Sequence, residues 1–485
     1  MPTPVTLDGH SLSIADVVAV ARGNAPVAIA PQALSAVQQS RRAVEAAIER
    51  GQTMYGVNTG FGKLAHVRIP PEQARQLQLN LIRSHASGVG EPLAQDAVRA
   101  MMLLRANVLL RGTSGVRPVL PELLVDMLNA RVHPTVPSQG SVGASGDLAP
   151  LSHLALAMIG EGDVQVSRPI TLEAKEGLAF VNGTQAQTGL AALLVTDAWT
   201  AWRTAHAAAA MSLEAVRGSP DPFDARIHDA RPHPQQQRSA TLLRDLLADS
   251  EIRESHREND PRVQDAYSLR CTPQVLGAAG EGLAFAERLV TTELNAATDN
   301  PLVFGDDVIS GGNFHGQPIA LALDVVAIAL TTLAGLAERR LERVVNPDLS
   351  SGLPAFLAHD PGLESGFMTA QIAAAALVAD CRVLATPASV QSVPTEGNQE
   401  DVVPMGMSAA WKAGRILANT ERILAIELLA GAQGLEYLKP LRPATAVARL
   451  QAAIREDSPA LTGDRPMTAD IERVAAGIRA GRFAP

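Results

Sequence analysis

The sequence predicts a mainly α-helical protein: a long central helical bundle with a smaller N-terminal mixed region. Three observations predict this class. Long segments are rich in Ala, Leu, Glu and Arg, strand-like alternation is scarce, and apolar residues make up 46% of the 485-residue chain. Helices that are apolar nearly all round need cover on every side, which favours the centre of a bundle. Two closely interlocked regions are expected, 1–200 and 201–485, with an approximate boundary between them.

The N-terminal region is expected to combine helices with a glycine-rich loop. A first helix is predicted over Pro31–Arg50, after a stretch punctuated by glycine and proline. The sequence Tyr-Gly-Val-Asn-Thr-Gly-Phe-Gly at 55–62 follows, and its three glycines indicate a loop with unusual backbone angles. Shorter helices are then expected at Pro71–Ser87, Asp96–Leu110 and Pro121–Ala130.

Longer helices are predicted in the rest of the chain, where internal prolines are few. One of them contains Pro318–Ala337, which is almost wholly apolar and long enough to span a bilayer. Asp324 interrupts this segment and Arg339 follows closely, so we expect a buried bundle helix and no membrane span. The expected long helices are Gln187–Arg217, Pro273–Asn295, Pro318–Val345, Ser365–Ala385 and Met407–Gln433.

Charge and composition argue against several classes of function. The net charge of −9 lacks the basic footprint that nucleic-acid binding needs. The only cysteines, Cys271 and Cys381, form neither a disulfide framework nor a metal knuckle, which fits a reducing cytosol. The first residues lack a basic segment followed by an apolar core, so we expect no signal peptide. No His-Glu-x-x-His pair occurs among the eleven histidines, so no metal is expected.

The most informative segment is Gly-Ser-Val-Gly-Ala-Ser-Gly-Asp-Leu-Ala-Pro-Leu at 140–151. It begins as a loop of very small residues and continues into a helix whose expected N-cap is Asp147, with Pro150 tolerated in the first turn. The helix is expected to stop at Gly160. The Ala-Ser-Gly at 144–146 therefore precedes a helix N-terminus and its partial positive charge.

This segment resembles the signature of the MIO-dependent ammonia-lyases, in which Ala-Ser-Gly cyclises and loses water to give 4-methylidene-imidazol-5-one (MIO). The resemblance implies a fumarase/aspartase-like fold, and an MIO formed from Ala144, Ser145 and Gly146 with no external cofactor. Further motifs occur in the family's order: Tyr-Gly-Val-Asn-Thr-Gly-Phe-Gly at 55–62, Ser-His-Ala-Ser-Gly-Val-Gly-Glu-Pro at 84–92, Asn-Gly-Thr-Gln at 182–185, Gln-Asp-Ala-Tyr-Ser-Leu-Arg-Cys at 264–271, Gly-Gly-Asn-Phe-His-Gly-Gln-Pro at 311–318 and Asn-Gln-Glu-Asp at 398–401.

The need for such an electrophile follows from the chemistry of amino acids. The β-proton is not acidic, the amine is a poor leaving group, and common side chains are nucleophiles. A dehydrated Ser145 supplies a carbon electrophile that can take the substrate amine. Ring closure requires the Gly146 nitrogen to approach the Ala144 carbonyl, which only a backbone with little side-chain bulk allows.

The resemblance also implies roles for residues outside the loop. Tyr55 would remove the β-proton, which requires donors or a positive field that favour phenolate. Arg270 would hold the substrate carboxylate through two hydrogen bonds. If residues 264–270 are helical, Gln264, Tyr267 and Arg270 lie on one face. The resemblance also implies that Tyr267 is a catalytic residue. The residues expected to line the substrate and MIO pocket are Asn182, Gln264 and Phe314.

Three features favour the histidine type within this family: Ser84 followed by His85, Phe314 followed by His315, and Glu400. Glu400 can accept a hydrogen bond from an imidazole N–H, whereas beside a phenyl ring a buried carboxylate lacks a partner. The implied reaction converts L-histidine to trans-urocanate and ammonia, a carbon–nitrogen lyase step of histidine catabolism. His85 and Glu400 are the expected side-chain contacts.

Departures from the histidine pattern leave alternatives open. Thr386 and Gln391 replace a usual histidine and aspartate, and Val402 and Pro404 alter the segment after Asp401. The alternatives are a tyrosine or phenylalanine ammonia-lyase, an aminomutase with the same MIO chemistry, and a non-catalytic helical scaffold. The resemblance further implies a cytoplasmic homotetramer whose active sites are each assembled from three subunits.

Overall fold

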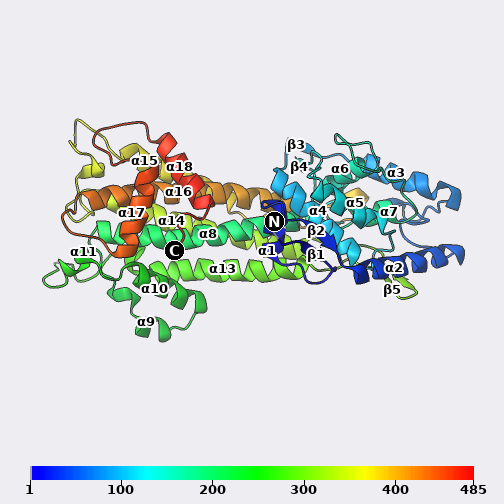
Figure 1. Ribbon diagram of the computed structural model, residues 1–485, viewed down its shortest axis with the longest axis horizontal. Coiled ribbons are helices and arrows are strands. Elements are labelled where there is room, and N and C mark those ends of the chain that lie inside the picture. The colour runs from blue at the N-terminus through cyan, green and yellow to red at the C-terminus, as the bar shows by residue number, and fades with distance from the viewer. Residues whose placement is uncertain (1–2, 261) are drawn as a thin grey trace. The chain divides into compact units, whose positions relative to one another are not determined.

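The computed structural model describes residues 3–260 and 262–485, and they are mostly helical (Figure 1). The chain divides into two compact units. The first comprises Met1–Leu194, Ala286–Asp324 and Pro387–Trp411, and the second comprises Val195–Phe285, Val325–Thr386 and Lys412–Pro485. The expected boundary near residue 200 remains a prediction.

Helix α4 (Gln95–Leu110) forms the core of the first unit, since every residue from Ala97 to Leu110 is buried. Helices α1 (Ile14–Ala21) and α5 (Val119–Asn129) pack against it. Burial on all sides agrees with the almost unbroken apolar sequence of α4. The other helices of this unit are α2 (Pro31–Glu49), α3 (Ala74–His85), α6 (Leu148–Met158) and α7 (Glu176–Val181), with 3-10 turns η1 (Gly62–Leu64), η2 (Pro71–Gln73) and η5 (Glu396–Asn398).

Three two-stranded sheets complete the first unit. β1 (Val5–Leu7) and β2 (Val27–Ile29) are parallel, and Val5 pairs with Val27. The other two sheets are antiparallel. They are β3 (Val89–Pro92) with β4 (Pro137–Gln139), and β5 (Leu302–Phe304) with β6 (Asp307–Ile309).

Helix α15 and parts of four other long helices form the bundle of the second unit, and the sequence predicted all five. The Trp202 indole of α8 donates to the Leu276 carbonyl of α13 at 2.6 Å, and the fully buried Arg340 of α14 pairs with Glu427 of α16 at 2.5 Å. An unpaired charge at that depth would be costly, so this pair fixes α14 against α16. The long helices are α8 (Gln185–Ala215), α13 (Thr272–Glu293), α14 (Gln317–Val345), α15 (Met368–Leu384) and α16 (Gly406–Glu436).

Shorter helices, for which the sequence analysis gave no firm bounds, also belong to the second unit. They are α9 (Ala225–Asp229), α10 (Pro234–Leu246), α11 (Glu251–Glu254), α12 (Tyr267–Arg270), α17 (Thr445–Asp457) and α18 (Thr468–Arg479), with turns η3 (Asp221–Phe223) and η4 (Ala355–Leu357). Helix α14 is long and apolar enough to cross a membrane by length and composition alone. However, 61% of its most apolar stretch is buried within the chain, a share that a core helix also shows.

Candidate active site

Ala144, Ser145 and Gly146 lie in a tight loop between β4 and α6. Ala144 and Ser145 face a cavity of about 460 Å³. Gly146 forms backbone bridges to Gly143 and Gly183. Its φ is +74°, and a Cβ at this position would lie 2.3 Å from the Gly183 carbonyl oxygen, so only glycine fits. The left-handed backbone and the close approach of Gly183 therefore leave no room for a side chain at position 146.

Asp147 occupies the N-cap position of α6, as the sequence predicted, but its side chain does not cap this helix. Its carboxylate makes no bond within α6 and instead accepts from the Gln187 backbone N–H at 2.8 Å, in the first turn of α8. Ser141 Oγ lies 3.1 Å away. The unpaired N–H groups of α8 and its positive end compete successfully for this carboxylate. Complete burial raises the pKa of Asp147 to about 7.

Asn182 follows the last residue of α7 and contacts the Ala-Ser-Gly loop directly. Its Nδ2 donates to the Ser145 carbonyl oxygen at 2.8 Å. Its Oδ1 is buried and has no hydrogen-bond partner among residues 3–260 and 262–485. The fully buried Arg105 holds the Asn182 backbone carbonyl at 3.1 Å, which fixes this residue in place. Asn182 therefore offers a donor to the loop and a free acceptor beside the cavity.

Tyr55 lines the same cavity as Ser145, on the glycine-rich loop that the sequence predicted. The Gly62 backbone N–H donates to the Tyr55 hydroxyl at 2.9 Å, and the Phe61 ring packs edge-on at 6.4 Å. Burial raises the pKa of Tyr55 above its ordinary value; the Gly62 N–H opposes the shift, and the charges of Glu396 and Glu400 add to it. The Gly62 donor is the kind of group that stabilises a phenolate.

Glu400 and Glu396 bring two carboxylates to this cavity from the loop that contains η5. Glu400 Oε2 accepts from Thr395 Oγ1 at 2.6 Å, and the Thr395 N–H donates to the Glu400 carbonyl at 2.8 Å. Desolvation raises the pKa of Glu396, and the charge of Glu400 adds to the shift. The sequence predicted Glu400 at the site but not Glu396.

His85 ends α3 and does not line the cavity. Its Nδ1 lies 2.9 Å from the Leu81 carbonyl and 3.0 Å from Ser84 Oγ. Because a carbonyl can only accept, we assign the ring proton to Nδ1, which leaves Nε2 as an acceptor. Burial lowers the pKa of His85, whereas the Leu81 carbonyl and the charge of Glu400 oppose this. His85 is therefore within electrostatic reach of Glu400.

The segment after β6 closes another side of the cavity, and Phe314 and His315 line it there. His315 Nε2 lies 3.1 Å from the Val402 carbonyl oxygen, and the Gly316 N–H donates to the Gly143 carbonyl at 3.0 Å. These bonds connect the Phe314 segment both to the Ala-Ser-Gly loop and to the segment after Glu400.

Gln264, Tyr267 and Arg270 belong to the second unit and do not line this cavity. The expected common helical face is only partly present. Helix α12 begins at Tyr267, so Gln264 precedes it, whereas the Arg270 guanidinium lies 5.9 Å from the Tyr267 ring centroid. The Tyr267 side chain is 75% exposed. Because α12 starts at Tyr267, Gln264 lies outside the helix and does not share a helical face with Tyr267 and Arg270.

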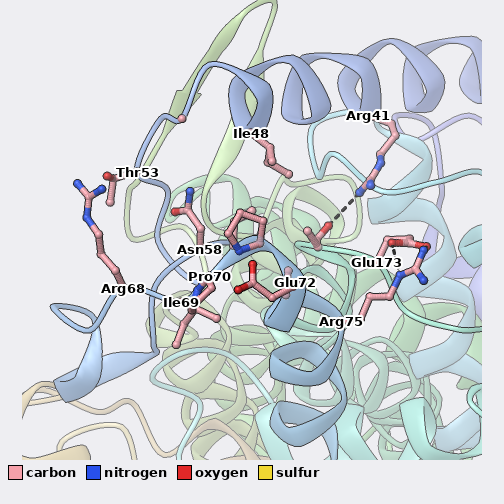
Figure 2. Close-up of a pocket in the computed structure, with 15 residues that line it drawn as sticks. Arg41, Ile48, Thr53, Asn58, Arg68, Ile69, Pro70, Glu72, Arg75 and Glu173 are labelled. Atoms are coloured by element: carbon pink, nitrogen blue, oxygen red, sulfur yellow. Dashed lines mark hydrogen bonds and ion pairs between the residues drawn. The ribbon is translucent and has the colours of Figure 1, made fainter.

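A second cavity, of about 710 Å³, lies in the first unit beside residues 51–58 (Figure 2). Its charged groups are largely engaged: Arg75 forms a bidentate pair with Glu173, and Arg41 donates to the Ala174 carbonyl at 2.9 Å. Ile48 and Pro70 contribute apolar surface (Figure 2). None of the predicted site residues lines this larger cavity, so we place the site at the smaller one.

Several cavity residues had no signal in the sequence beyond their closeness to a motif. Glu396 lies two residues before the Asn-Gln-Glu-Asp motif, and Gly397 beside it marks a turn. Gln187 does not line the cavity, but it is fully buried, and neither of its side-chain polar atoms has a hydrogen-bond partner among the described residues. Four further cavity residues lie within the motifs although no role was predicted for them: Gly62, Gly311, Gln399 and Asp401. Four others line the cavity from outside the motifs: Ala65, Asn300, Ser310 and Val402.

Comparison with known proteins connects this geometry to a family. The family model described as aromatic amino acid lyase matches residues 12–456. The chain belongs to this family. It is therefore a carbon–nitrogen lyase, as the motifs predicted, and the helical fold class is confirmed. The family is MIO-dependent.

Relatives and solved structures match along nearly the whole chain. The histidine ammonia-lyase of Koribacter versatilis is 50% identical and covers 99% of this chain and 98% of its own. The histidine ammonia-lyase of Geobacillus thermodenitrificans is 49% identical, and the match covers 98% of this chain and 97% of that protein. Among structures, tyrosine aminomutase from Streptomyces globisporus is 42% identical with a TM-score of 0.94, over 99% and 98%. Histidine ammonia-lyase from Trypanosoma cruzi is 43% identical with a TM-score of 0.91, over 99% and 94%.

Proposed function

We propose that this chain is a histidine ammonia-lyase, which converts L-histidine to trans-urocanate and ammonia without oxidation. One observation carries the proposal. A single cavity collects Ser145, the base candidate Tyr55 and the carboxylate of Glu400, and Asn182 touches both cavity and loop. The relatives named histidine ammonia-lyase, which share 49–50% sequence identity with this chain, support the same substrate.

Ala144, Ser145 and Gly146 would form the MIO in this chain. That group supplies an electrophilic carbon, which makes the substrate amine a better leaving group. Asn182 Nδ2 would withdraw electron density through the Ser145 carbonyl, and Asn182 Oδ1 would accept a hydrogen bond from the substrate ammonium. The small residues around Gly146 allow the substrate amine to come close.

Tyr55 would take the β-proton as a phenolate. The Gly62 N–H, 2.9 Å from the hydroxyl, stabilises the negative charge, while Phe61 keeps the ring in place. Phe314 would pack against the reacting group from the opposite segment. The proton leaves the substrate carbon for the Tyr55 oxygen as the carbon–nitrogen bond breaks.

Glu400 would select the imidazole ring by accepting its N–H through the oxygen that Thr395 does not occupy. His85, neutral at ordinary pH, would lie near this contact as a second polar group. An aromatic substrate without ring nitrogens would displace water from the second Glu400 oxygen and leave that oxygen without a donor, at a cost of roughly 2 kcal/mol.

Gln264, Tyr267 and Arg270 would reach the site from another copy of the chain, with Arg270 binding the substrate carboxylate. We therefore propose a homotetramer with shared active sites and a cytoplasmic location. Supporting this, α14 leaves much of its most apolar stretch uncovered within one chain; Leu321 and Ile328 are 44% and 47% exposed.

An aminomutase is the second candidate, because tyrosine aminomutase structures match this chain with TM-scores up to 0.94. The test is an ultraviolet assay of the purified protein with L-histidine, L-tyrosine and L-phenylalanine in parallel. Urocanate from L-histidine alone is expected. Coumarate or cinnamate, or a β-amino acid detected by chromatography, would overturn the substrate assignment.

A further inference from the structure

Glu396 brings a second carboxylate to the cavity that holds Glu400, Tyr55 and Ser145. We propose that Glu396 and Glu400 together recognise the substrate side chain, each binding one of the two ring nitrogens of an imidazole. This inference rests on the proposed function and deepens it, because it assigns specificity to a residue outside the recognised motifs.

The Glu396 carboxylate is held against the turn that positions Tyr55. Gly62 has φ of +51°, and a Cβ there would lie 1.6 Å from Glu396 Oε1 and 2.0 Å from its Cδ. The carboxylate therefore occupies the space beside the Gly62 Cα, and the N–H of the same residue donates to the Tyr55 hydroxyl. A substrate whose β-carbon faces Tyr55 would thus have its ring within range of Glu396.

Both carboxylates have oxygen atoms free for a ligand. Within residues 3–260 and 262–485, the Glu396 side chain has no hydrogen-bond or ion-pair partner, and Glu400 uses only Oε2, for Thr395. By contrast, Glu173 in the neighbouring cavity is fully occupied by Arg75 (Figure 2). Glu396 is exposed in the single chain, so its unpaired carboxylate is accessible to a ligand that enters the cavity.

The backbone around Glu396 adopts a conformation that side chains disfavour. Glu396, Gly397 and Asn398 have φ of 50°, 61° and 67°, so three consecutive residues lie in the left-handed region. Residues with a Cβ rarely adopt it. The bridge between Thr395 and Glu400 closes this turn, and both carboxylates of the turn line the cavity. This disfavoured backbone conformation places Glu396 at the cavity.

Imidazole is the ring that matches a carboxylate pair. In its neutral form it has one N–H donor and one bare nitrogen, while two carboxylates that share one proton offer one acceptor and one donor. Desolvation and the charge of Glu400 both favour a proton on Glu396. An imidazolium between two ionised carboxylates has the same total number of protons as a neutral imidazole between a carboxyl group and a carboxylate. The hydrogen bonds therefore match whether the shared proton lies on the ring or on a glutamate. A phenyl ring provides neither partner.

The decisive variant is Glu396→Gln, which keeps the size of the side chain but removes its charge. We expect kcat/KM for L-histidine to fall by roughly 10- to 100-fold, mainly through KM, because a charge-assisted hydrogen bond is lost. Glu400→Gln should behave similarly. Glu49→Gln, an exposed change on α2, is the matched control and should leave the kinetics unchanged.

Histidines methylated on one ring nitrogen or the other provide a second readout. Each methyl group should block one carboxylate in the wild-type protein. Glu396→Ala creates space and should restore turnover of one methyl isomer only, whereas Glu400→Ala should restore the other. A purely structural effect would lower turnover of all substrates alike.

The outcomes separate the two proposals. If the wild-type protein produces no urocanate, the proposed function fails and this inference falls with it. If the wild-type protein is active and Glu396→Gln matches it in KM and kcat/KM, only the assignment of Glu396 is overturned. Rescue of neither methyl isomer by Glu396→Ala would also overturn that assignment.

Discussion

Asn182 donates a hydrogen bond of 2.8 Å from its side-chain amide to the carbonyl oxygen of Ser145. The two residues are 37 positions apart in the sequence, and Arg105 donates a hydrogen bond to the Asn182 backbone carbonyl. The donor therefore has a set direction before any substrate arrives. In a desolvated site, a donor aimed at an oxygen that gains electron density is worth more than the same bond in water.

Asn182→Ala removes this donor and should lower kcat by roughly 10²- to 10³-fold, as loss of one preorganised donor does elsewhere. Asn182→Asp keeps the size of the side chain but places an oxygen against the Ser145 carbonyl, so it should be no better. Steady-state kinetics, with circular dichroism to verify folding, would check this. Wild-type kcat in Asn182→Ala would show that the bond serves structure only.

Ser145→Ala should reduce turnover to background, by roughly 10³-fold or more, because no dehydrated electrophile can form without the serine hydroxyl. The change removes only one oxygen from a small side chain, so the fold and the assembly state should persist. Size-exclusion chromatography together with the ultraviolet assay measures both. Near-wild-type activity would contradict the proposed chemistry.

The pH dependence of kcat/KM should report the ionisation of Tyr55. Burial raises the pKa of Tyr55, and Glu396 and Glu400 raise it further. If the Tyr55 phenolate is the active form, as we propose, activity should rise with pH, and removing a carboxylate charge should move this rising limb to lower pH. Glu396→Gln and Glu400→Gln should both show the shift, and Glu49→Gln should not. An unmoved limb in both variants would exclude Tyr55 as the titrating base.

Much of the helical framework could be predicted from apolar patterning. The long segments predicted at 187–217, 273–295 and 407–433 correspond to α8, α13 and α16 to within a few residues. Helices such as α9 and α11 escaped because four or five residues carry too little periodic signal. Local pattern placed Asp147 correctly at the N-cap of α6, but it could not reveal the hydrogen bond of Asp147 to the first turn of α8, which begins 38 residues further along the chain.

For the site, motif-based prediction brought together Tyr55, Ser145, Asn182, Phe314 and Glu400 in one cavity. It missed Glu396, because the place of this residue at the cavity depends on a left-handed turn and on closeness to the distant Gly62, and neither is encoded in a short pattern. Contacts between sequence-distant segments are set by tertiary packing, which local composition does not reveal.

Asp147→Asn should change how stability depends on pH. In the folded chain Asp147 keeps its proton up to about pH 7, whereas its ordinary value of 3.8 applies when unfolded. The folded state thus binds more protons between these values, so this group's contribution to stability falls as pH rises from 4 to 7. Asparagine is neutral throughout and can still accept from the Gln187 N–H. The difference in melting temperature, variant minus wild type, should therefore grow between pH 5 and pH 8; a constant difference would contradict the buried, protonated Asp147.

Complementation between inactive variants would test whether Ser145 and Arg270 act from different chains. Ser145 lines the cavity of the first unit, whereas Arg270 lies in the second unit and does not line it. Ser145→Ala and Arg270→Ala should each be inactive alone. If the two residues of one site come from different chains, random co-assembly at equal amounts leaves about a quarter of the sites with both residues intact.

Co-expression of the two variants should therefore restore up to about a quarter of wild-type activity, since a site needs one intact copy from each of two chains. Co-expression of Ser145→Ala with Tyr55→Phe is the matched control, because Tyr55 and Ser145 line one cavity within a single unit. If one chain supplies both of those residues, every site in the control lacks one of them and activity stays at background. Equal recovery in both pairs would point to subunits exchanging larger segments, and recovery in neither would place Arg270 and Ser145 in the same chain's site.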